Sequence, residues 1–113
     1  MKVVDILNLK PHVEKLAEKE MDIESAVILA KTLRQIVIIA NVFEQKRLAL
    51  VKEFGEAKED GSMEVVDEEK KILFQKALEQ VLIEDKEIDK VNSGLLSVTV
   101  TPLEVINILP IFV

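Results

Sequence analysis

The longest regular pattern of apolar positions in the chain predicts one helix from Ser25 to about Ala57. Its apolar residues recur at alternating spacings of four and three, which is the seam of a helix that packs along a partner. At 1.5 Å per residue this helix would be about 50 Å long. The seam comprises Leu29, Leu33, Ile36, Ala40, Phe43, Leu50, Phe54 and Ala57, with Arg47 as its one polar member.

Four consecutive apolar residues, Ile36, Val37, Ile38 and Ile39, interrupt the amphipathic pattern of this helix. Because they point to all sides, we expect its N-terminal half to be buried all round. The block is either part of the core or an oligomer interface, and the sequence leaves both interpretations open. Arg47 also has two interpretations. Its side chain reaches solvent, or it pairs with an acid on the next helix, such as Glu79.

A turn and a second helix are expected to follow. Gly55 weakens or ends the long helix, and Lys58–Ser62 has the composition of a turn. Met63–Val66 is either a short strand or a lead-in. Asp67 is a good N-cap for a helix that runs to about Val81, antiparallel to the C-terminal half of the long helix. The apolar stripe of this second helix is Phe74, Ala77, Leu78 and Val81.

For the N-terminal segment, the sequence predicts shorter elements than the long helix that follows it. Residues Val3–Leu9 form an apolar run that is either a strand or the lead-in to a helix. Pro11 suits a first helical turn, so we expect a short helix over Lys10–Glu20. Met21–Ile23 then forms an extended link to the long helix.

The C-terminal third predicts two strands and a short helix. Glu87–Val91 and Leu95–Val100 have the composition of strands, separated by a turn. Thr101–Glu104 places Thr at the cap, Pro at the first helical position and Glu three residues after the cap, which is a capping box. The helix ends by Pro110. The apolar final residues 111–113 are expected to dock on the core or on a partner.

These elements predict a single domain, residues 1–113, of the α+β class that is mainly α. It consists of an antiparallel helical hairpin, a small two-stranded element and a short C-terminal helix.

Charge and composition narrow the range of partners. The formal net charge is −6, whereas binding to nucleic acid requires clustered Lys and Arg, so nucleic acid is not the expected partner. Lys31 and Arg34 interrupt the apolar stretch Ser25–Phe43, which argues against a membrane span. There is no cysteine, which fits a reducing compartment.

No pattern of residues indicates a catalytic, cofactor or metal site. His12 is the only histidine, which excludes a two-His zinc site within one chain. The three glycines are isolated, so there is no phosphate-binding loop. Acidic residues cluster around the turn and the second helix start as Glu56, Glu59, Asp60, Asp67 and Glu68. They are most simply turn and first-turn residues, and otherwise a cation site or an acidic patch for a basic partner.

Three segments carry a resemblance to a known family. The long helix closes on Leu50-Val51-Lys52-Glu53-Phe54-Gly55-Glu56, and the acidic turn Glu59-Asp60-Gly61-Ser62-Met63 follows. After the second helix comes Thr101-Pro102-Leu103-Glu104. In this order the chain from Met21 onward resembles a family of small uncharacterised phage and prophage proteins, from which its Ile36–Ile39 block departs by being more apolar. The resemblance implies a phage-encoded protein and carries over no catalytic residue.

We therefore expect a non-enzymatic interaction protein without a cofactor, located in the host cytoplasm or the virion. Its partner would be a second copy or a phage structural protein, and its role virion assembly or that of an accessory chaperone. The alternative is a small acidic inhibitor of a host defence or nucleic-acid-processing protein. The expected interface residues are Ile36, Val37, Ile38, Ile39, Phe43, Arg47, Ile111 and Phe112.

Overall fold

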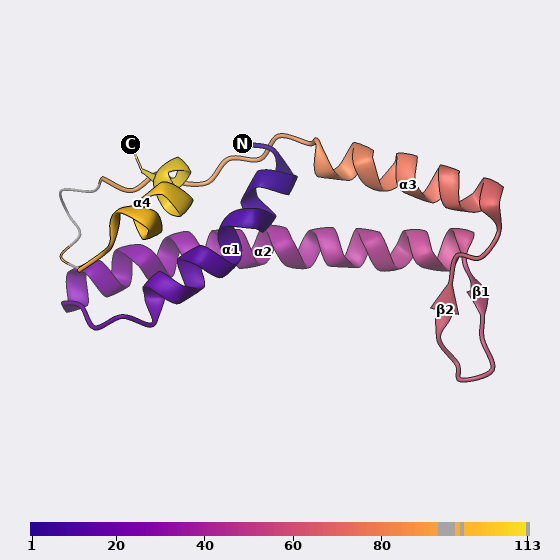
Figure 1. Ribbon diagram of the computed structural model, residues 1–113, viewed down its shortest axis with the longest axis horizontal. Helices are drawn as coiled ribbons and strands as arrows, with labels where there is room; N and C mark the ends of the chain where they lie inside the picture. The colour runs from indigo at the N-terminus through magenta and orange to yellow at the C-terminus, as the bar shows by residue number, and fades with distance from the viewer. Residues whose placement is uncertain (93–96, 98, 113) are drawn as a thin grey trace.

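Helix α2 (Ile23–Phe54) forms the long axis of the molecule, as the computed structural model shows for residues 1–92, 97 and 99–112 (Figure 1). Helix α1 (Val3–Ala17) packs against the N-terminal half of α2, and α3 (Glu68–Leu82) runs back along its C-terminal half. Helix α4 (Pro102–Ile108) and the 3₁₀ turn η2 (Leu109–Ile111) lie next to α1. The molecule measures 51 × 28 × 22 Å, and its class is the predicted one, α+β and mainly α.

Both ends of α2 follow from local chemistry. The side chain of Asp22 accepts a hydrogen bond from the backbone N–H of Ser25 at 2.9 Å and caps the first turn. The hydrogen bonds from Ser25 hold the pKa of Asp22 below its ordinary value. At the other end, a Cβ on Gly55 would overlap the carbonyl oxygen of Val51. The residue that leaves the helix therefore has to lack a side chain.

Helix α1 begins at Val3, so the expected start at Lys10 is wrong. Its buried residues are spaced three and four apart on one face, which is a helical period; they are Val3, Ile6, Leu9, Val13 and Leu16. Asp5 and Asn8, which interrupt the apolar run, lie on the exposed face. Pro11 lies inside the helix rather than in its first turn.

One core holds together what we call the body: α1, α2 as far as Ile36, the segment Ile88–Val91, and α4 with η2. Aliphatic side chains from each of these elements pack into it. Ser25 is also buried there, and its hydroxyl oxygen accepts a hydrogen bond from the backbone N–H of Ser97 at 2.7 Å. The main cluster consists of Ile6, Leu9, Val13, Leu16, Leu29, Ile36, Ile88, Ile108 and Ile111.

In the sequence, the small sheet lies between α2 and α3. The two-stranded element was predicted after α3, and this position is corrected. Strands β1 (Glu56–Ala57) and β2 (Met63–Glu64) pair antiparallel. Gly61 has a φ of 84°, which glycine adopts without strain. The side chain of Asp60 accepts a hydrogen bond from the N–H of Ser62 at 3.0 Å and fixes the turn.

The segment Glu87–Val91, expected as a strand, is extended but joins no sheet; Val91 forms only an isolated bridge, to Phe112. Its backbone N–H groups bond to other elements: that of Asp89 to the side chain of Gln35 at 2.7 Å, and that of Val91 to the carbonyl of Ile111 at 2.7 Å. These bonds take the place of a strand partner. In the other expected strand, Leu95–Val100, residues 95, 96 and 98 lie outside the described residues.

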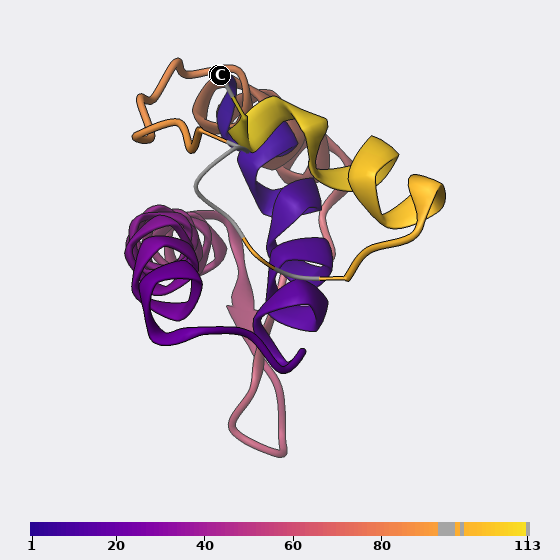
Figure 2. The same cartoon turned by 90° about the vertical axis from the view of Figure 1, so that its left-hand side faces the viewer.

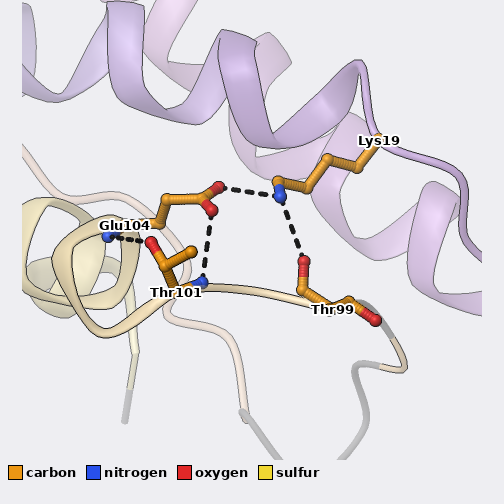
Figure 3. A network of polar contacts seen from close by, with 4 residues as sticks. All are labelled: Lys19, Thr99, Thr101 and Glu104. Atoms are coloured by element: carbon orange, nitrogen blue, oxygen red, sulfur yellow. Dashed lines mark hydrogen bonds and ion pairs between the residues drawn. The ribbon is translucent and has the colours of Figure 1, made fainter.

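The predicted capping box of α4 is present and also ties this helix to α1 (Figure 3). The hydroxyl of Thr101 accepts from the N–H of Glu104 at 3.3 Å, and the carboxylate of Glu104 accepts from the N–H of Thr101 at 3.2 Å. Lys19, just after α1, pairs with Glu104 at 3.0 Å and donates to the carbonyl of Thr99 at 3.1 Å. Lys19 and Thr101 together hold the pKa of Glu104 below its ordinary value of 4.5.

Replacing Glu104 with Gln is therefore expected to make the stability of the protein less sensitive to acid. A carboxyl with a lowered pKa in the folded state stabilises the protein above its unfolded pKa and loses that contribution as the pH falls through the folded pKa. Urea unfolding at pH 7 and pH 3 measures the difference. The wild type should lose more stability over this range than Glu104→Gln. Lys19→Met should lose an intermediate amount of stability, because the hydrogen bonds between Glu104 and Thr101 remain. If Glu104→Gln loses as much stability as the wild type between the two pH values, the lowered pKa of Glu104 is not what stabilises the protein.

Candidate interaction surface

The half of the molecule beyond the body has no core of its own. We call it the arm: α2 from Val37 to Phe54, the β1–β2 hairpin, and α3 (Figure 1). No residue from Val37 to Leu82 is buried. The arm nevertheless carries many large apolar side chains, and those that are clearly exposed are Ile38, Val42, Leu48, Met63, Val66, Ile72 and Leu73.

The seam between α2 and α3 is only half-buried. Two helices can cover each other on one side, and the structure places no third layer over the described residues of the arm (Figures 1 and 2). The predicted apolar stripes of the two helices include Phe43, Leu50 and Phe54 of α2 and Phe74, Leu78 and Val81 of α3, and none of these residues is fully buried. The expectation that the N-terminal half of α2 is buried all round is also wrong, because Ile38 is 53% exposed.

A cleft of about 120 Å³ opens at the base of the arm, where α1, α2 and α3 meet. We call it the basal cleft. Val3, Ile39, Phe43 and Val81 supply apolar surface, and the exposed side chains of Ile38 and Val42 extend this surface outward. Most ligand and partner pockets have such an apolar lining with a few polar groups at the edge.

Three charged side chains form the rim of the basal cleft. The carboxylate of Glu84 lies 3.3 Å from the amine of Lys46 and 3.7 Å from that of Lys86. Two lysines share one carboxylate, so the rim carries a formal charge of +1 in a protein whose net charge is −6. All three groups are partly exposed, and they can therefore meet a negatively charged partner.

The opposite end of the arm is acidic. Residues 56–64 carry four carboxylates and one lysine, a formal charge of −3, and all are exposed; we call this hairpin the acidic tip. Glu56 and Glu59 have no ion pair within the described residues, and Asp60 has its pKa lowered by hydrogen bonds from Ser62. The hairpin projects away from α3 (Figure 1).

The two other acids of the predicted acidic patch, Asp67 and Glu68, belong to the start of α3 rather than to the projecting hairpin. Asp67 accepts a hydrogen bond from the N–H of Glu69 at 3.3 Å and caps that helix, as predicted. The patch is therefore divided between a free hairpin and a helix cap.

Six of the eight predicted interface residues lie in the core or at the basal cleft, and Val37 and Arg47 lie in neither. Ile36 and Ile111 are fully buried in the body, and Phe112 packs against the same core. Residues 38, 39 and 43 line the cleft, while Val37 is half-buried. Of the apolar C-terminal residues, Val113 lies outside the described residues.

Arg47 does not bridge the two helices of the arm. Its guanidinium is bound by two hydrogen bonds to Glu44 one turn earlier on α2, one of them 3.0 Å from Nε to Oε2. This i,i+3 pair keeps Arg47 on the helix surface. The described residues show no pairing between Arg47 and Glu79.

Sequence reasoning missed six residues of the site: Val3, Val42, Lys46, Val81, Glu84 and Lys86. Ile38, Val42 and Lys46 are spaced four apart on α2, so they form one row along the helix surface. That row was visible in the sequence. Glu84 and Lys86 reach the cleft only because the chain after α3 returns past the N-terminus, where the N–H of Val3 bonds to the carbonyl of Glu84 at 3.0 Å.

The surface of the molecule is large for its mass. It exposes 7821 Å², whereas a compact monomer of 12.8 kDa exposes about 6,300 Å². The radius of gyration is 17.7 Å, against about 13 Å for a compact domain of this length. The arm extends away from the body, which gives the molecule this elongated shape (Figure 1).

Helix α2 and the acidic side chains of the described residues bear on membrane and metal binding. Helix α2 is long and apolar enough to cross a membrane, a property that core helices of soluble proteins share, and only 17% of its most apolar stretch is buried. Within the described ranges, no group of three or more His, Cys, Asp or Glu side chains could hold a metal ion. His12 is half-buried between α1 and α4, beside Asn107.

The sequence matches no protein-family model, and comparisons with curated proteins and with solved structures give no match either.

Proposed function

We propose that this protein is a non-enzymatic interaction protein that binds another protein chain along its arm. A phage-type role, in virion assembly or as an accessory chaperone, is the context in which we place it. The arm supports the binding role, and the resemblance of the segments around Gly55, Gly61 and Thr101 to phage proteins supports the context.

The observation that carries the proposal is the arm's lack of any buried residue. Burial of apolar area is the dominant favourable term in folding and in association, at about 25 cal/mol per Å². A helical pair with half-buried Phe43, Leu50 and Phe54 leaves much of this stabilisation unused. A protein partner that covers the cleft side of the arm would supply it.

Affinity capture with two matched variants tests this proposal. Ile38 and Leu48 lie on the same helix with similar exposure, 53% and 48%, but only Ile38 lines the basal cleft. We expect a protein chain, whether a second copy or another protein, to co-purify with the tagged wild type and with Leu48→Asp. Its recovery should fall at least tenfold with Ile38→Asp, because a charge would be buried in the interface.

Circular dichroism is the control, since both replaced side chains are exposed and helicity should be retained. Equal recovery of the captured chain with both variants contradicts a role for the basal cleft. Unfolding of Ile38→Asp would instead show that this side chain belongs to the core.

A second candidate function is that of an acidic inhibitor, which the projecting acidic tip favours. Glu56 and Glu59 are exposed and lack ion pairs within the described residues, so they are available to a basic site. Capture of a host protein that is lost with Glu56→Lys and Glu59→Lys, and that weakens strongly with salt, would support this candidate. Capture that depends on Ile38 alone would speak against it.

A further inference from the structure

We propose that the partner of the arm is a second copy of this chain, packed antiparallel about a two-fold axis. In this dimer the acidic tip of each copy lies beside the basic rim of the other copy's basal cleft. The inference rests on the proposed function, because it names the occupant of the same surface. It is carried by the juxtaposition of an apolar cleft, a basic rim and an acidic tip on one uncovered arm.

The available area is sufficient for such a dimer. A stable protein interface of standard size buries about 800 Å² on each partner. The chain exposes about 1,500 Å² more than a compact monomer of its mass, from 7821 Å² against about 6,300 Å². The exposed apolar side chains of Ile38 and Val42 stand at the edge of the surface that would be covered. Two such hairpins together would form a four-helix arrangement with a closed core.

Two-fold symmetry makes the arrangement self-complementary. In such an interface the same patch is used on both copies, so each contact occurs twice. On α2 the cleft residue Val42 and the start of the tip at Gly55 are separated by about 20 Å at 1.5 Å per residue. An antiparallel pairing centred between these two points puts the tip of one copy against the cleft of the other.

The charges at the two ends favour this orientation. The tip carries −3 and the rim of Lys46, Glu84 and Lys86 carries +1. Antiparallel packing brings these opposite charges together at both ends of the interface, whereas parallel packing would place the two acidic tips side by side. Complementary charges of this kind determine orientation more than affinity. The net charge of −6 also disfavours nucleic acid as the occupant.

The first measurement is the solution mass by light scattering across concentration. We expect twice the 12.8 kDa of a single chain for the wild type and for Ile106→Asp, a control that places the same charge on α4 of the body, where Ile106 is 61% exposed and does not line the basal cleft. Val42→Asp should have the mass of one chain with unchanged helicity, because Val42 is 42% exposed in the monomer and lines the cleft. A wild type that is monomeric at every concentration overturns the proposal.

A charge-reversal experiment tests the antiparallel geometry. A rim variant carries Lys46→Glu and Lys86→Glu, and a tip variant carries Glu56→Lys and Glu59→Lys. Each variant alone should dimerise at least tenfold more weakly than the wild type at low salt, because both of its tip–rim contacts become repulsive. An equimolar mixture of the two should recover dimerisation to within about threefold of the wild type, since both contacts are then attractive again.

The outcomes separate this inference from the proposed function. A dimer whose two variants are not restored by mixing would have another geometry and would overturn the antiparallel arrangement. A monomeric wild type that still captures another protein in an Ile38-dependent way would overturn the dimer and leave the proposed function intact. A monomer without Ile38-dependent capture would overturn both.

Discussion

Replacing Ile36 with Ala is expected to lower the free energy of unfolding by about 3 kcal/mol, within the range for aliphatic residues truncated in a packed core. Ile36 is fully buried, at 0% exposure, in the cluster that joins α1, α2 and the C-terminal segment. Removal of three side-chain carbons leaves a cavity among elements that are far apart in sequence. The other buried side chains of this cluster are held in place by their own elements, so the core of the body cannot easily collapse around the cavity.

Leu48→Ala is the matched control for this prediction. Leu48 lies on the same helix, is 48% exposed and does not line the basal cleft. Its truncation should change the free energy of unfolding by less than about 1 kcal/mol, the usual effect of a surface substitution. Urea unfolding followed by circular dichroism measures both. If the two variants are destabilised equally, the difference in packing between body and arm is not real.

The starts of α3 and α4 and the turn at Gly61 could be predicted from sequence because each is determined by a few neighbouring residues. Asp67 caps the backbone at the start of α3, Gly61 adopts a positive φ, and Thr101 with Glu104 forms the capping box. Chemistry of this kind depends on side chains within three residues of one another. It is therefore visible without knowledge of the tertiary structure.

Two of the wrong predictions concern the chain after α3 and the start of α1. The chain after α3 was expected to pair with the segment that follows it, but its N–H groups bond to Gln35 and to Ile111 instead. The start of α1 was missed because a short apolar run does not distinguish a strand from one face of a helix. Val3, Ile6 and Leu9 have the spacing of one helical face, and that face is buried in the core of the body, so the segment is helical.

The arm shows most clearly what apolar periodicity cannot predict. The seam through Phe43, Leu50 and Phe54 indicates which side of α2 requires a partner, but not whether the same chain supplies one. The sequence left Ile36–Ile39 open between core and interface, and the structure divides the block. Ile36 is in the core, while Ile38 is exposed at the basal cleft. The rim residues Glu84 and Lys86 could not be foreseen, because their position depends on how the chain returns past Met1.

Replacing Ile111 with Ala is expected to destabilise the protein by about 3 kcal/mol, although this residue lies near the end of the chain. Terminal residues usually fray and tolerate change. Ile111, however, is fully buried at 0% exposure, and its carbonyl accepts a hydrogen bond from the N–H of Val91 at 2.7 Å. The C-terminal segment therefore closes the body in the way that an internal element does.

Leu109, in the same 3₁₀ turn, provides the control because it is 53% exposed. Leu109→Ala should lower the free energy of unfolding by less than about 1 kcal/mol in the same urea titration. Ile111→Val, which removes a single methylene, should fall between the two at about 1 kcal/mol. This order follows from packing alone. If Ile111→Ala lowers the free energy of unfolding no more than Leu109→Ala does, the C-terminal segment is not part of the core. If the order holds, the C-terminal segment is as much a part of the core of the body as Ile36 is.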